Sequence, residues 1–506
     1  MNVKIKTLEE LSRISDSLKK MDKRVVHCHG VFDLLHPGHI KHLETAKSQG
    51  DVLLVTITAD EFVNKGPGRP AFNHGLRAES LSALSMVDYV AINFASTAVD
   101  AINVLKPTVY VKGNDYANKE SDVTGKIHDE EDAVTKWGGR IFFTNDPAFS
   151  SSNLINEYIK IFPDETEVWL RNFRKKYSCE QIFDYLDRAS KLKVLVLGEA
   201  IIDEYVFCEA LGKSSKDPIL ASQFKSIEAY AGGSIAVANH LAGFVQQVDF
   251  ATYLGDQDRK QDFVQNSLKP NVNSTYFTHQ NAPTIHKRRF LEYYAGSKLF
   301  ELYTMSNVPL TKEEEAPFVS FIEKRLKDFD LVVVMDYGHG MMTQNAITTL
   351  CRDAKFMAVN TQANAGNRGF NTISRYSRAD YVCLADHEVA LETRMRYSPW
   401  QDLALEVTRR IACPKFTITH GKRGSSHYQV DQGFTEVPAL ATRIVDRVGA
   451  GDAVMAITSL MAKLDAPWEI TGFLGNLAGA QLVSDLGNRV ILDKISLSKH
   501  ITSLLK

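Results

Sequence analysis

Two short stretches of the chain bring polar side chains and glycines together at a predicted helix start. The first is "HGVFDLLHPGHIKHLETAK", residues 29–47, in which His36 and His39 flank Pro37 and Gly38. Pro37 favours the first turn of a helix, so both imidazoles lie at a helix N-terminus. Free N–H groups and the positive end of the helix dipole attract anions there, and Gly38 lets a phosphate approach the backbone. The chemistry predicted here is phosphate binding.

Further residues that suit a polyphosphate follow this motif. They are Lys65 and Arg69 in "NKGPGRP", Arg77 at another predicted helix start, Lys112 and Asp115 in "VKGND", and Ser150, Ser151 and Ser152 in "FSSSNLIN". Each alone is as well explained by packing or capping, but together they outline a site for a nucleoside triphosphate. Asp33 has an equally simple explanation, because an Asx-type hydrogen bond would hold its own turn.

The second stretch is "DRVGAGDAVMAITSLMAKL", residues 446–464. Gly449, Ala450 and Gly451 precede an apolar pattern of helical period, so their N–H groups can point at an anion. Asp452 can take the proton from a sugar hydroxyl while these amides stabilise the transferring phosphoryl group. An ordinary glycine turn is the alternative for this motif alone. The arrangement as a whole is typical of a kinase.

The elements that must position these residues alternate between strands and helices. From residue 24 to about 144, short β-rich runs such as "DVLLVTIT" alternate with segments of helical period, which predicts a doubly wound parallel sheet. A second, larger α/β series begins at "KVLVLGEAIID", after a charged helical stretch without strand signals. We therefore predict an α/β protein of two domains, residues 1–158 and 192–506, joined by a helical linker, residues 159–191.

Composition excludes several other classes of protein. Of 506 residues, 44% are hydrophobic and 24% charged, and the net charge of -2 favours neither disorder nor a nucleic-acid partner. No stretch reaches the ~18 consecutive apolar residues of a membrane span, and the amphipathic start does not resemble a signal peptide. The six cysteines form no CxxC pair, which fits reduced thiols. We expect a cytoplasmic enzyme without a membrane partner.

Residues 1–158 resemble the HxGH nucleotidyltransferase superfamily through "TLEEL", "GVFDLLHPGHI", "VDYV", "VKGNDY" and "FSSSNLI". They are most similar to the transferase domain of the bifunctional heptose kinase/adenylyltransferases, and more distantly to glycerol-3-phosphate cytidylyltransferase. The resemblance implies a Rossmann-like fold. It also implies that a sugar-phosphate or polyol-phosphate oxygen attacks the α-phosphate of a nucleoside triphosphate and expels pyrophosphate, without a covalent enzyme intermediate.

The resemblance also assigns residues to this reaction. His36 and His39 would bind the reacting phosphates, assisted by Lys65 and Arg77. The other nucleotide and phosphate contacts would be Gly30, Phe32, Gly38, Lys112, Gly113, Asp115, Ser151 and Ser152, with the two serines on the β- and γ-phosphates. Mg²⁺ would screen the triphosphate charge, and no protein-only metal cage is visible.

Residues 192–506 resemble the ribokinase-like sugar kinases, again most closely those of the heptose enzymes, through "KDPI", "TIHKRRFLE", "VVMDYGHGMM" and "TITHGKRGSS". The resemblance implies that Asp452 is the base and that residues 449–451 form the anion hole. Sugar contacts would come from Asp203, Gly232, Gly233 and Asn239. Lys287 and Arg289 would reach a substrate phosphate, or else form a solvated charged face.

Some features depart from this family. The transferase precedes the kinase, opposite to the bifunctional enzymes. Where the heptose kinases have Asp-Pro-Lys-Gly, this chain has "NTQANAGNRGFN", and the expected Asn-x-x-Glu segment is "ADHE". Glu388 keeps the carboxylate that family members use around Mg²⁺ and its waters, whereas Ala385 replaces the amide. The phosphoryl acceptor can therefore differ from heptose 7-phosphate, or the kinase can be weak.

We predict a bifunctional sugar kinase and sugar-phosphate nucleotidyltransferase that makes a nucleotide-activated sugar. An ADP-heptose-like product for lipopolysaccharide or capsule synthesis fits both halves. One alternative is a CDP-forming cytidylyltransferase for a sugar or polyol phosphate, since HxGH does not specify the base. Another is that the C-terminal half is a non-catalytic binding or dimerisation module. The partners are small molecules, namely ATP or CTP and a sugar or sugar phosphate, and ribokinase-like relatives suggest a homodimer.

Overall fold

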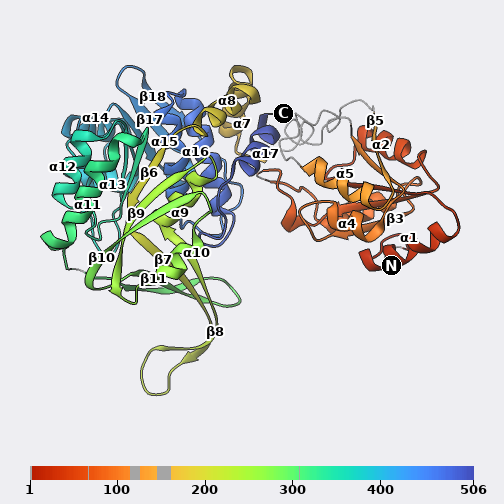
Figure 1. The fold of residues 1–506 in the computed structure, drawn as a ribbon, viewed down its shortest axis with the longest axis horizontal. Helices are drawn as coiled ribbons and strands as arrows, with labels where there is room; N and C mark the ends of the chain where they lie inside the picture. The colour runs from red at the N-terminus through yellow and green to blue at the C-terminus, as the bar shows by residue number, and fades with distance from the viewer. Residues whose placement is uncertain (1–2, 67, 114–125, 145–160, 307, 506) are drawn as a thin grey trace. The chain divides into compact units, whose positions relative to one another are not determined.

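The computed structural model describes residues 3–66, 68–113, 126–144, 161–306 and 308–505. The chain divides into two compact units: Met1–Asp164 together with Ser498–Lys506, and Glu165–Leu497. Figure 1 shows that each unit contains a sheet flanked by helices. The predicted α/β class with two domains is confirmed. The boundaries predicted at residues 158 and 191 stay a prediction.

Short runs of valine, leucine and isoleucine form the sheet of the first unit. Its parallel strands lie in the order β3-β2-β1-β4-β5 and are β1 (Val25–Gly30), β2 (Val52–Thr58), β3 (Tyr89–Asn93), β4 (Val109–Gly113) and β5 (Arg140–Thr144). The helices are α1 (Leu8–Lys20), α2 (Pro37–Lys47), α3 (His74–Ser82), α4 (Val99–Leu105) and α5 (Lys126–Lys136). The strand order reverses between β1 and β4. Ligands of such sheets bind beyond the carboxyl ends of the strands at this point.

The second unit contains a larger sheet and a smaller one. The larger sheet is parallel from β10 to β16 and antiparallel from β16 to β18, in the order β10-β9-β6-β13-β14-β15-β16-β17-β18. Its strands are β6 (Val194–Gly198), β9 (Val248–Gln257), β10 (Val272–Pro283), β13 (Leu331–Asp336), β14 (Met357–Thr361), β15 (Tyr381–Ala385), β16 (Lys415–Thr419), β17 (Ser425–Gln429) and β18 (Gly433–Val437). Buried Val, Leu and Met side chains from β6, β13 and β14 form its core.

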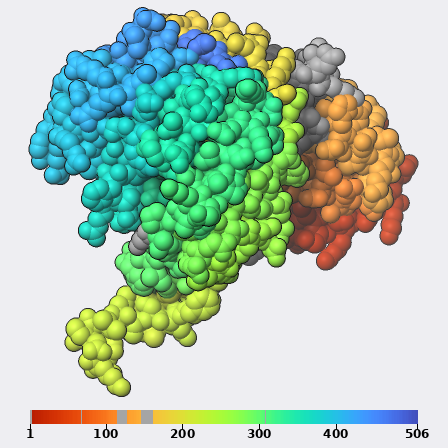
Figure 2. Space-filling model, turned by 60° about the vertical axis from the view of Figure 1, so that its left-hand side comes forward, coloured from red at the N-terminus to blue at the C-terminus, as the bar shows by residue number. Residues whose placement is uncertain are grey.

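The smaller sheet, here called the lid sheet, has the order β12-β11-β7-β8. Its strands are β7 (Ala200–Lys213), β8 (Leu220–Gly233), β11 (Ile285–Glu292) and β12 (Lys298–Thr304). β7 begins two residues after β6 ends, so the lid sheet is attached directly to an interior strand of the larger sheet. Figure 2 shows the β7–β8 hairpin as an arm that projects from this unit.

Helices cover the larger sheet. They are α9 (Ser234–Ala242), α10 (Gln261–Ser267), α11 (Lys312–Arg325), α12 (Gln344–Asp353), α13 (Asp386–Thr393), α14 (Trp400–Arg410), α15 (Ala450–Lys463) and α16 (Trp468–Val483). A further helix, α17 (Lys494–Leu505), ends in the first unit. α15 is buried from Ala453 to Ala462, which makes it a rigid support for the residues at its N-terminus. No described helix is long and apolar enough to cross a membrane. The six cysteines, all described, are free thiols.

The stretch predicted as a helical connection contains α7 (Asp164–Lys176) and α8 (Cys179–Ala189). Both helices belong to the second unit apart from the first residue of α7. The ring of Phe173 stacks on that of Phe473 in α16, with centroids 4.6 Å apart, and Trp169 stacks on Phe173 at 4.8 Å. Aromatic burial therefore fixes α7 against the second unit.

We expect Phe173→Ala to lower the free energy of unfolding by about 3 to 5 kcal/mol, because it leaves a cavity under α7. Urea denaturation followed by circular dichroism would measure this. Val168→Ala is the matched control, since Val168 lies on the same helix and is 54% exposed. A loss for Phe173→Ala no larger than that of the control would contradict the proposed role of this aromatic stack.

Candidate active sites

The first candidate site is at the start of α2. His36 is the N-cap residue, and its Nδ1 accepts hydrogen bonds from the N–H groups of Gly38 at 3.1 Å and His39 at 3.4 Å. The sequence predicted that these amides would bind phosphate, but the imidazole of His36 occupies them because it caps its own helix. Nε2 is therefore the protonated nitrogen of His36. The rings of His36 and His39 stack with centroids 3.9 Å apart.

Both imidazoles are neutral at pH 7. Burial lowers the pKa of His36, and the charge of Lys65 lowers it further. Burial also lowers the pKa of His39 to about 3, with additional contributions from His36 and Lys65. Among the described residues, Nδ1 of His39 has no hydrogen-bond partner. His39 also has a hydrogen bond with the backbone of Leu34, so its Nδ1 is the ring nitrogen that remains for a phosphate, while Lys65 supplies positive charge.

The loop that carries Lys65 is held by Asp33 of the "GVFD" segment. The carboxylate of Asp33 accepts hydrogen bonds from Ala71 N–H at 2.8 and 2.9 Å and from Phe72 N–H at 3.1 Å. The sequence suggested that Asp33 would hold its own turn. Asp33 does hold a turn by accepting backbone hydrogen bonds, but the turn belongs to a loop 38 residues later in the chain.

Arg77 has a different role from the one the sequence suggested. Its side chain is fully buried, and its guanidinium donates to the carbonyl oxygens of Phe72, Val31 and Thr58 and to the carboxylate of Asp60. Four of its five N–H groups are thus engaged within the protein. We therefore assign Arg77 to holding the loop and leave it out of the phosphate site.

Other predicted residues lie around the carboxyl ends of β1 and β4. Lys112 Nζ is 2.8 Å from the buried carboxylate of Glu130, which also accepts a hydrogen bond from Tyr110 at 3.2 Å. Gly113 faces open space, since no described atom lies within 4 Å of a Cβ built there.

At the end of β1, a Cβ at Gly30 would lie 3.0 Å from the ring of Phe32. Phe32 has a φ of +48°, an unusual conformation for a bulky residue. Asp115, Ser150, Ser151 and Ser152 lie outside the described residues.

We expect Lys65→Met and Arg77→Met to separate chemistry from stability. Lys65 is exposed, so Lys65→Met should leave unfolding unchanged within about 0.5 kcal/mol and slow pyrophosphate release roughly a hundredfold. Arg77→Met should cost about 3 kcal/mol of stability, because it leaves buried carbonyl groups and Asp60 without their donor. Urea denaturation and a pyrophosphate assay on each variant would decide. Equal destabilisation by both substitutions would contradict this division of roles.

The second candidate site is at the start of α15. Gly449 is the N-cap residue with a φ of +81°, and a Cβ there would lie only 1.9 Å from Oδ1 of Asn488. Glycine is thus required twice, by backbone conformation and by close approach. Ala450 begins the helix. Gly451 is exposed, and no described atom lies within 4 Å of a Cβ built there. The first turn of α15 therefore opens to a space where an anion can reach its N–H groups.

Asp452, on this first turn, accepts a hydrogen bond from the hydroxyl of Tyr337 at 2.9 Å. Burial raises the pKa of Asp452 to about 7; the bond from Tyr337 opposes this rise, and the charge of Asp203 adds to it. Burial also raises the pKa of Tyr337 well above its usual value, so its hydroxyl stays a donor. A carboxylate that exchanges a proton near neutrality is suited to general base catalysis.

Asp203 lies on the lid sheet and is buried. Its carboxylate accepts hydrogen bonds from Arg289 at 2.5 Å and from the amide of Asn488 at 3.1 Å. A Cβ at Gly232 would lie 2.1 Å from Oδ2 of Asp203, so this carboxylate requires glycine on the neighbouring strand β8. Gly233, with a φ of +56°, caps α9.

Lys287 and Arg289 lie on β11 beside Asp203. Both are buried, 5% and 6% exposed, which excludes the alternative of a solvated charged face. Arg289 pairs with Asp203 and with Glu301. Lys287 lies over the rings of Tyr303 and Tyr337, at 5.4 and 5.9 Å from their centroids. Burial lowers the pKa of Lys287, while Asp203 and Asp452 raise it.

Asn239 does not face the sugar site. It is fully buried in α9, its amide nitrogen donates to the carbonyl of Ser267 at 2.7 Å, and its oxygen accepts from Lys269 N–H at 2.8 Å. The predicted sugar contact is therefore replaced by a structural one. The reason is that every residue of α9 is buried, so the helix lies inside the unit.

Sequence reasoning missed several polar residues of the second site. Glu199, just after β6, accepts hydrogen bonds from the N–H groups of Tyr337, His339 and Met341, and burial raises its pKa to about 7. Asp446 accepts bonds from Lys298 and Tyr205 of the lid sheet at 2.6 and 2.8 Å. The sequence did contain a signal for each residue. Glu199 directly follows a buried strand, and Asp446 comes just before the glycine turn at residues 449–451.

Glu388 accepts hydrogen bonds from Ala385 N–H at 2.8 Å and Ala363 N–H at 3.0 Å. It is buried, and burial raises its pKa. In this structure the carboxylate thus joins two loops at the ends of β14 and β15. No group of three or more His, Cys, Asp or Glu side chains among the described residues could hold a metal ion by itself.

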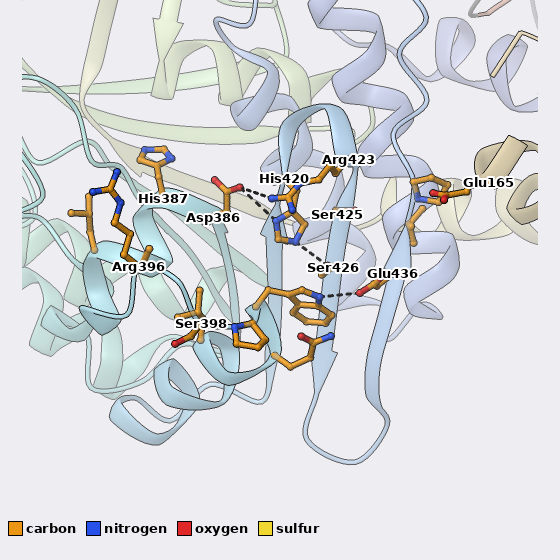
Figure 3. Close-up of a pocket in the computed structure, with 18 of the residues that line it drawn as sticks. Glu165, Asp386, His387, Arg396, Ser398, His420, Arg423, Ser425, Ser426 and Glu436 are labelled. Atoms are coloured by element: carbon orange, nitrogen blue, oxygen red, sulfur yellow. Dashed lines mark hydrogen bonds and ion pairs between the residues drawn. The ribbon is translucent and has the colours of Figure 1, made fainter. Parts of the chain in front are cut away.

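A cavity of about 1170 Å³ lies beyond the carboxyl ends of β15 and β16. Figure 3 shows Asp386, His420 and Arg423 pointing toward one another on one side of it. Arg423 pairs with Asp386 at 3.2 Å, and Trp400 donates from its indole to Glu436 at 2.9 Å. The cavity therefore offers aromatic surface and both signs of charge beside the glycine turn of "HGKRG".

We expect Tyr337→Phe to move the acidic limb of the kinase pH–rate profile from about 7 to higher pH, because the lost hydrogen bond stabilised the ionised form of Asp452. A change of roughly half a pH unit to one pH unit corresponds to about 1 kcal/mol. The measurement is kcat/KM against pH. Tyr376→Phe is the matched control, since Tyr376 is also buried and donates to Asp336 at 2.9 Å. An acidic limb that stays in place in Tyr337→Phe would refute the role of this hydroxyl.

The fold and the two sites define a protein that joins a nucleotidyltransferase-like unit to a sugar-kinase-like unit, in that order. Residues 27–157 match the cytidylyltransferase-like family model, and residues 191–495 match that of the pfkB family carbohydrate kinases. The second match covers more than half of the chain, so the chain belongs to the pfkB family. The order of the two domains predicted from the sequence is confirmed.

Individual relatives support the same division. "Bifunctional protein HldE" of Geobacter metallireducens is 39% identical over 167 residues, which is 32% of this chain and 33% of the relative. The protein of the same name from Aliarcobacter butzleri is 45% identical over 132 residues, 26% of this chain and 27% of the relative. These matches lie in the transferase region and span a third or less of each relative. A crystal structure of ribokinase from Thermotoga maritima, 16% identical, covers 62% of this chain and 99% of its own with a TM-score of 0.50, and shares the fold.

Proposed function

We propose that the chain is a bifunctional enzyme that phosphorylates a sugar at the second site and couples a sugar phosphate to a nucleotide at the first. The observation that carries the proposal is Asp452, a half-buried carboxylate whose pKa is raised to about 7, beside the open first turn of α15. The stacked pair of neutral imidazoles at α2 supports the transferase half. The similarity to bifunctional proteins in the transferase region supports the combination.

In the kinase reaction, Asp452 takes the proton of the attacking sugar hydroxyl, whose oxygen forms a bond to the γ-phosphorus of ATP. The bond between that phosphorus and the β–γ bridging oxygen breaks, and ADP leaves. The N–H groups of the first turn of α15, and Lys287, stabilise the charge on the transferring group. Asp203 orients the sugar. The nucleotide lies at the same edge of the sheet, toward the cavity shown in Figure 3.

In the transferase reaction, an oxygen of the sugar phosphate attacks the α-phosphorus of the nucleoside triphosphate, and pyrophosphate leaves. His36 and His39 donate hydrogen bonds to the phosphate oxygens, and Lys65 neutralises charge that builds up there. Lys112 and Gly113 border the pocket. Glu388 would act through water on a Mg²⁺ ion that accompanies the triphosphate, and this ion would supply further charge screening in both reactions.

By analogy with the heptose enzymes, our first proposal is that the sugar is a heptose. Its product would be ADP-linked and used in lipopolysaccharide or capsule synthesis. A second candidate is a CDP-linked sugar or polyol, which the cytidylyltransferase-like match over residues 27–157 favours. A panel of triphosphates against sugar 1-phosphates and polyol phosphates, with mass spectrometry of the nucleotide product, distinguishes them. A cytoplasmic location and a homodimer stay predictions.

We expect Asp452→Asn and His39→Ala to abolish different activities. Asp452→Asn should lower sugar-dependent ADP release by roughly a hundredfold or more and leave pyrophosphate release intact. His39→Ala should do the reverse, and each variant is the matched control of the other. Coupled assays for ADP and pyrophosphate would measure both. Loss of both activities in one variant would contradict two separate sites, and no ADP release with any sugar would favour a non-catalytic second unit.

A further inference from the structure

The end of the chain belongs to the first unit and contacts the loop that carries Lys65. Residues Ser498–Lys506 are grouped with Met1–Asp164, and α17 ends there with Ile501 and Leu504 buried. Nε2 of His500 lies 2.6 Å from Oδ1 of Asn64. An amide oxygen only accepts, so the imidazole is the donor. This contact joins residues 436 positions apart in the chain.

A second contact lies on the other side of Lys65. Gly66 has a φ of +99°, and a Cβ built there would lie 3.5 Å from Cα of His500. The loop backbone therefore packs against the backbone of α17. Burial lowers the pKa of His500 to about 4, so at pH 7 the ring is neutral and adds no charge beside Lys65. Both neighbours of Lys65 are thus held by one residue of the C-terminal segment.

The same loop acts on the histidine pair. The charge of Lys65 contributes to the lowered pKa of both His36 and His39, which places its ammonium group in their vicinity. Asp33 holds this loop at Ala71 and Phe72. Ala71 lies six residues beyond Lys65 in the chain. His500 contacts the loop closer to Lys65, at the residues directly before and after it.

We propose that the end of α17 supports the transferase site through His500, a positioning residue that holds Asn64 and Gly66 so that Lys65 faces the phosphates beside His36 and His39. The inference rests on the proposed transferase function. It assigns to the transferase unit a segment that follows the kinase in the sequence. A transferase fragment that ends near residue 164 lacks this anchor.

The test uses His500→Ala in the full chain. The KM for the triphosphate should rise roughly three- to tenfold, the effect of losing one hydrogen bond, while sugar-dependent ADP release stays unchanged. His500→Gln should restore much of the affinity, because its amide N–H can reach Asn64. Thr502→Ala is the matched control on the same helix: the hydroxyl of Thr502 donates at 2.8 Å to the carbonyl of Ser498. This control should keep the wild-type KM.

A second measurement does not depend on activity. Amide hydrogen exchange of residues 61–69 should be faster in His500→Ala than in the wild type and in Thr502→Ala. Wild-type KM and wild-type exchange in His500→Ala would overturn the proposal, as would a loss of both activities without faster exchange in the loop. If the wild type releases no pyrophosphate with any triphosphate, the proposed function fails, and the exchange measurement alone decides whether the C-terminal segment holds the loop.

Discussion

The buried carboxylate of Asp203 is the contact on which the arrangement of the second site depends. A buried charge is stable only when it is paired and hydrogen-bonded. Arg289 provides Asp203 with an ion pair and a hydrogen bond, and the side-chain amide of Asn488 donates a second hydrogen bond. The space for the carboxylate exists because Gly232 has no side chain. The oxygen of the same Asn488 side chain occupies the space that a Cβ of residue 449 would need. One carboxylate thus connects the lid sheet to the glycine turn that would bind the phosphoryl group.

The first site solves the same electrostatic problem in another way. Its histidines are neutral, and the charge is carried by a lysine on a loop whose backbone is held at several points. Asp33 accepts hydrogen bonds from the loop, and Arg77 donates to the carbonyl of Phe72 and to the carboxylate of Asp60, so both charged groups are engaged within the protein. An exposed ammonium on such a loop keeps its water, so its charge carries no burial cost in the free protein. Its position then depends on the contacts that hold the loop.

Local signals in the sequence were sufficient to predict the two helix starts. Pro37 after His36, and Gly449 before an apolar helix, act within a few residues, and both helices begin there. The parallel sheets followed from buried strands of apolar residues. The roles of Arg77 and Asn239 could not be predicted in this way. Their partners, such as Val31 and Ser267, lie 46 and 28 residues away, and a buried polar side chain bonds to whichever backbone groups packing leaves unsatisfied. The grouping of residues 498–506 with the first unit depends on contacts at still greater separation.

The neighbours of Asp452 explain why this carboxylate, and not Asp203, is suited to be the base. Asp203 is paired with a guanidinium at 2.5 Å, which orients this carboxylate as a hydrogen-bond acceptor. The hydrogen bond at Asp452 comes from a neutral phenol at 2.9 Å. A phenol supports the carboxylate without a formal charge, so burial can still raise the pKa to about 7. In the proposed kinase reaction, the kind of donor that each carboxylate receives would thereby assign orientation to Asp203 and proton transfer to Asp452.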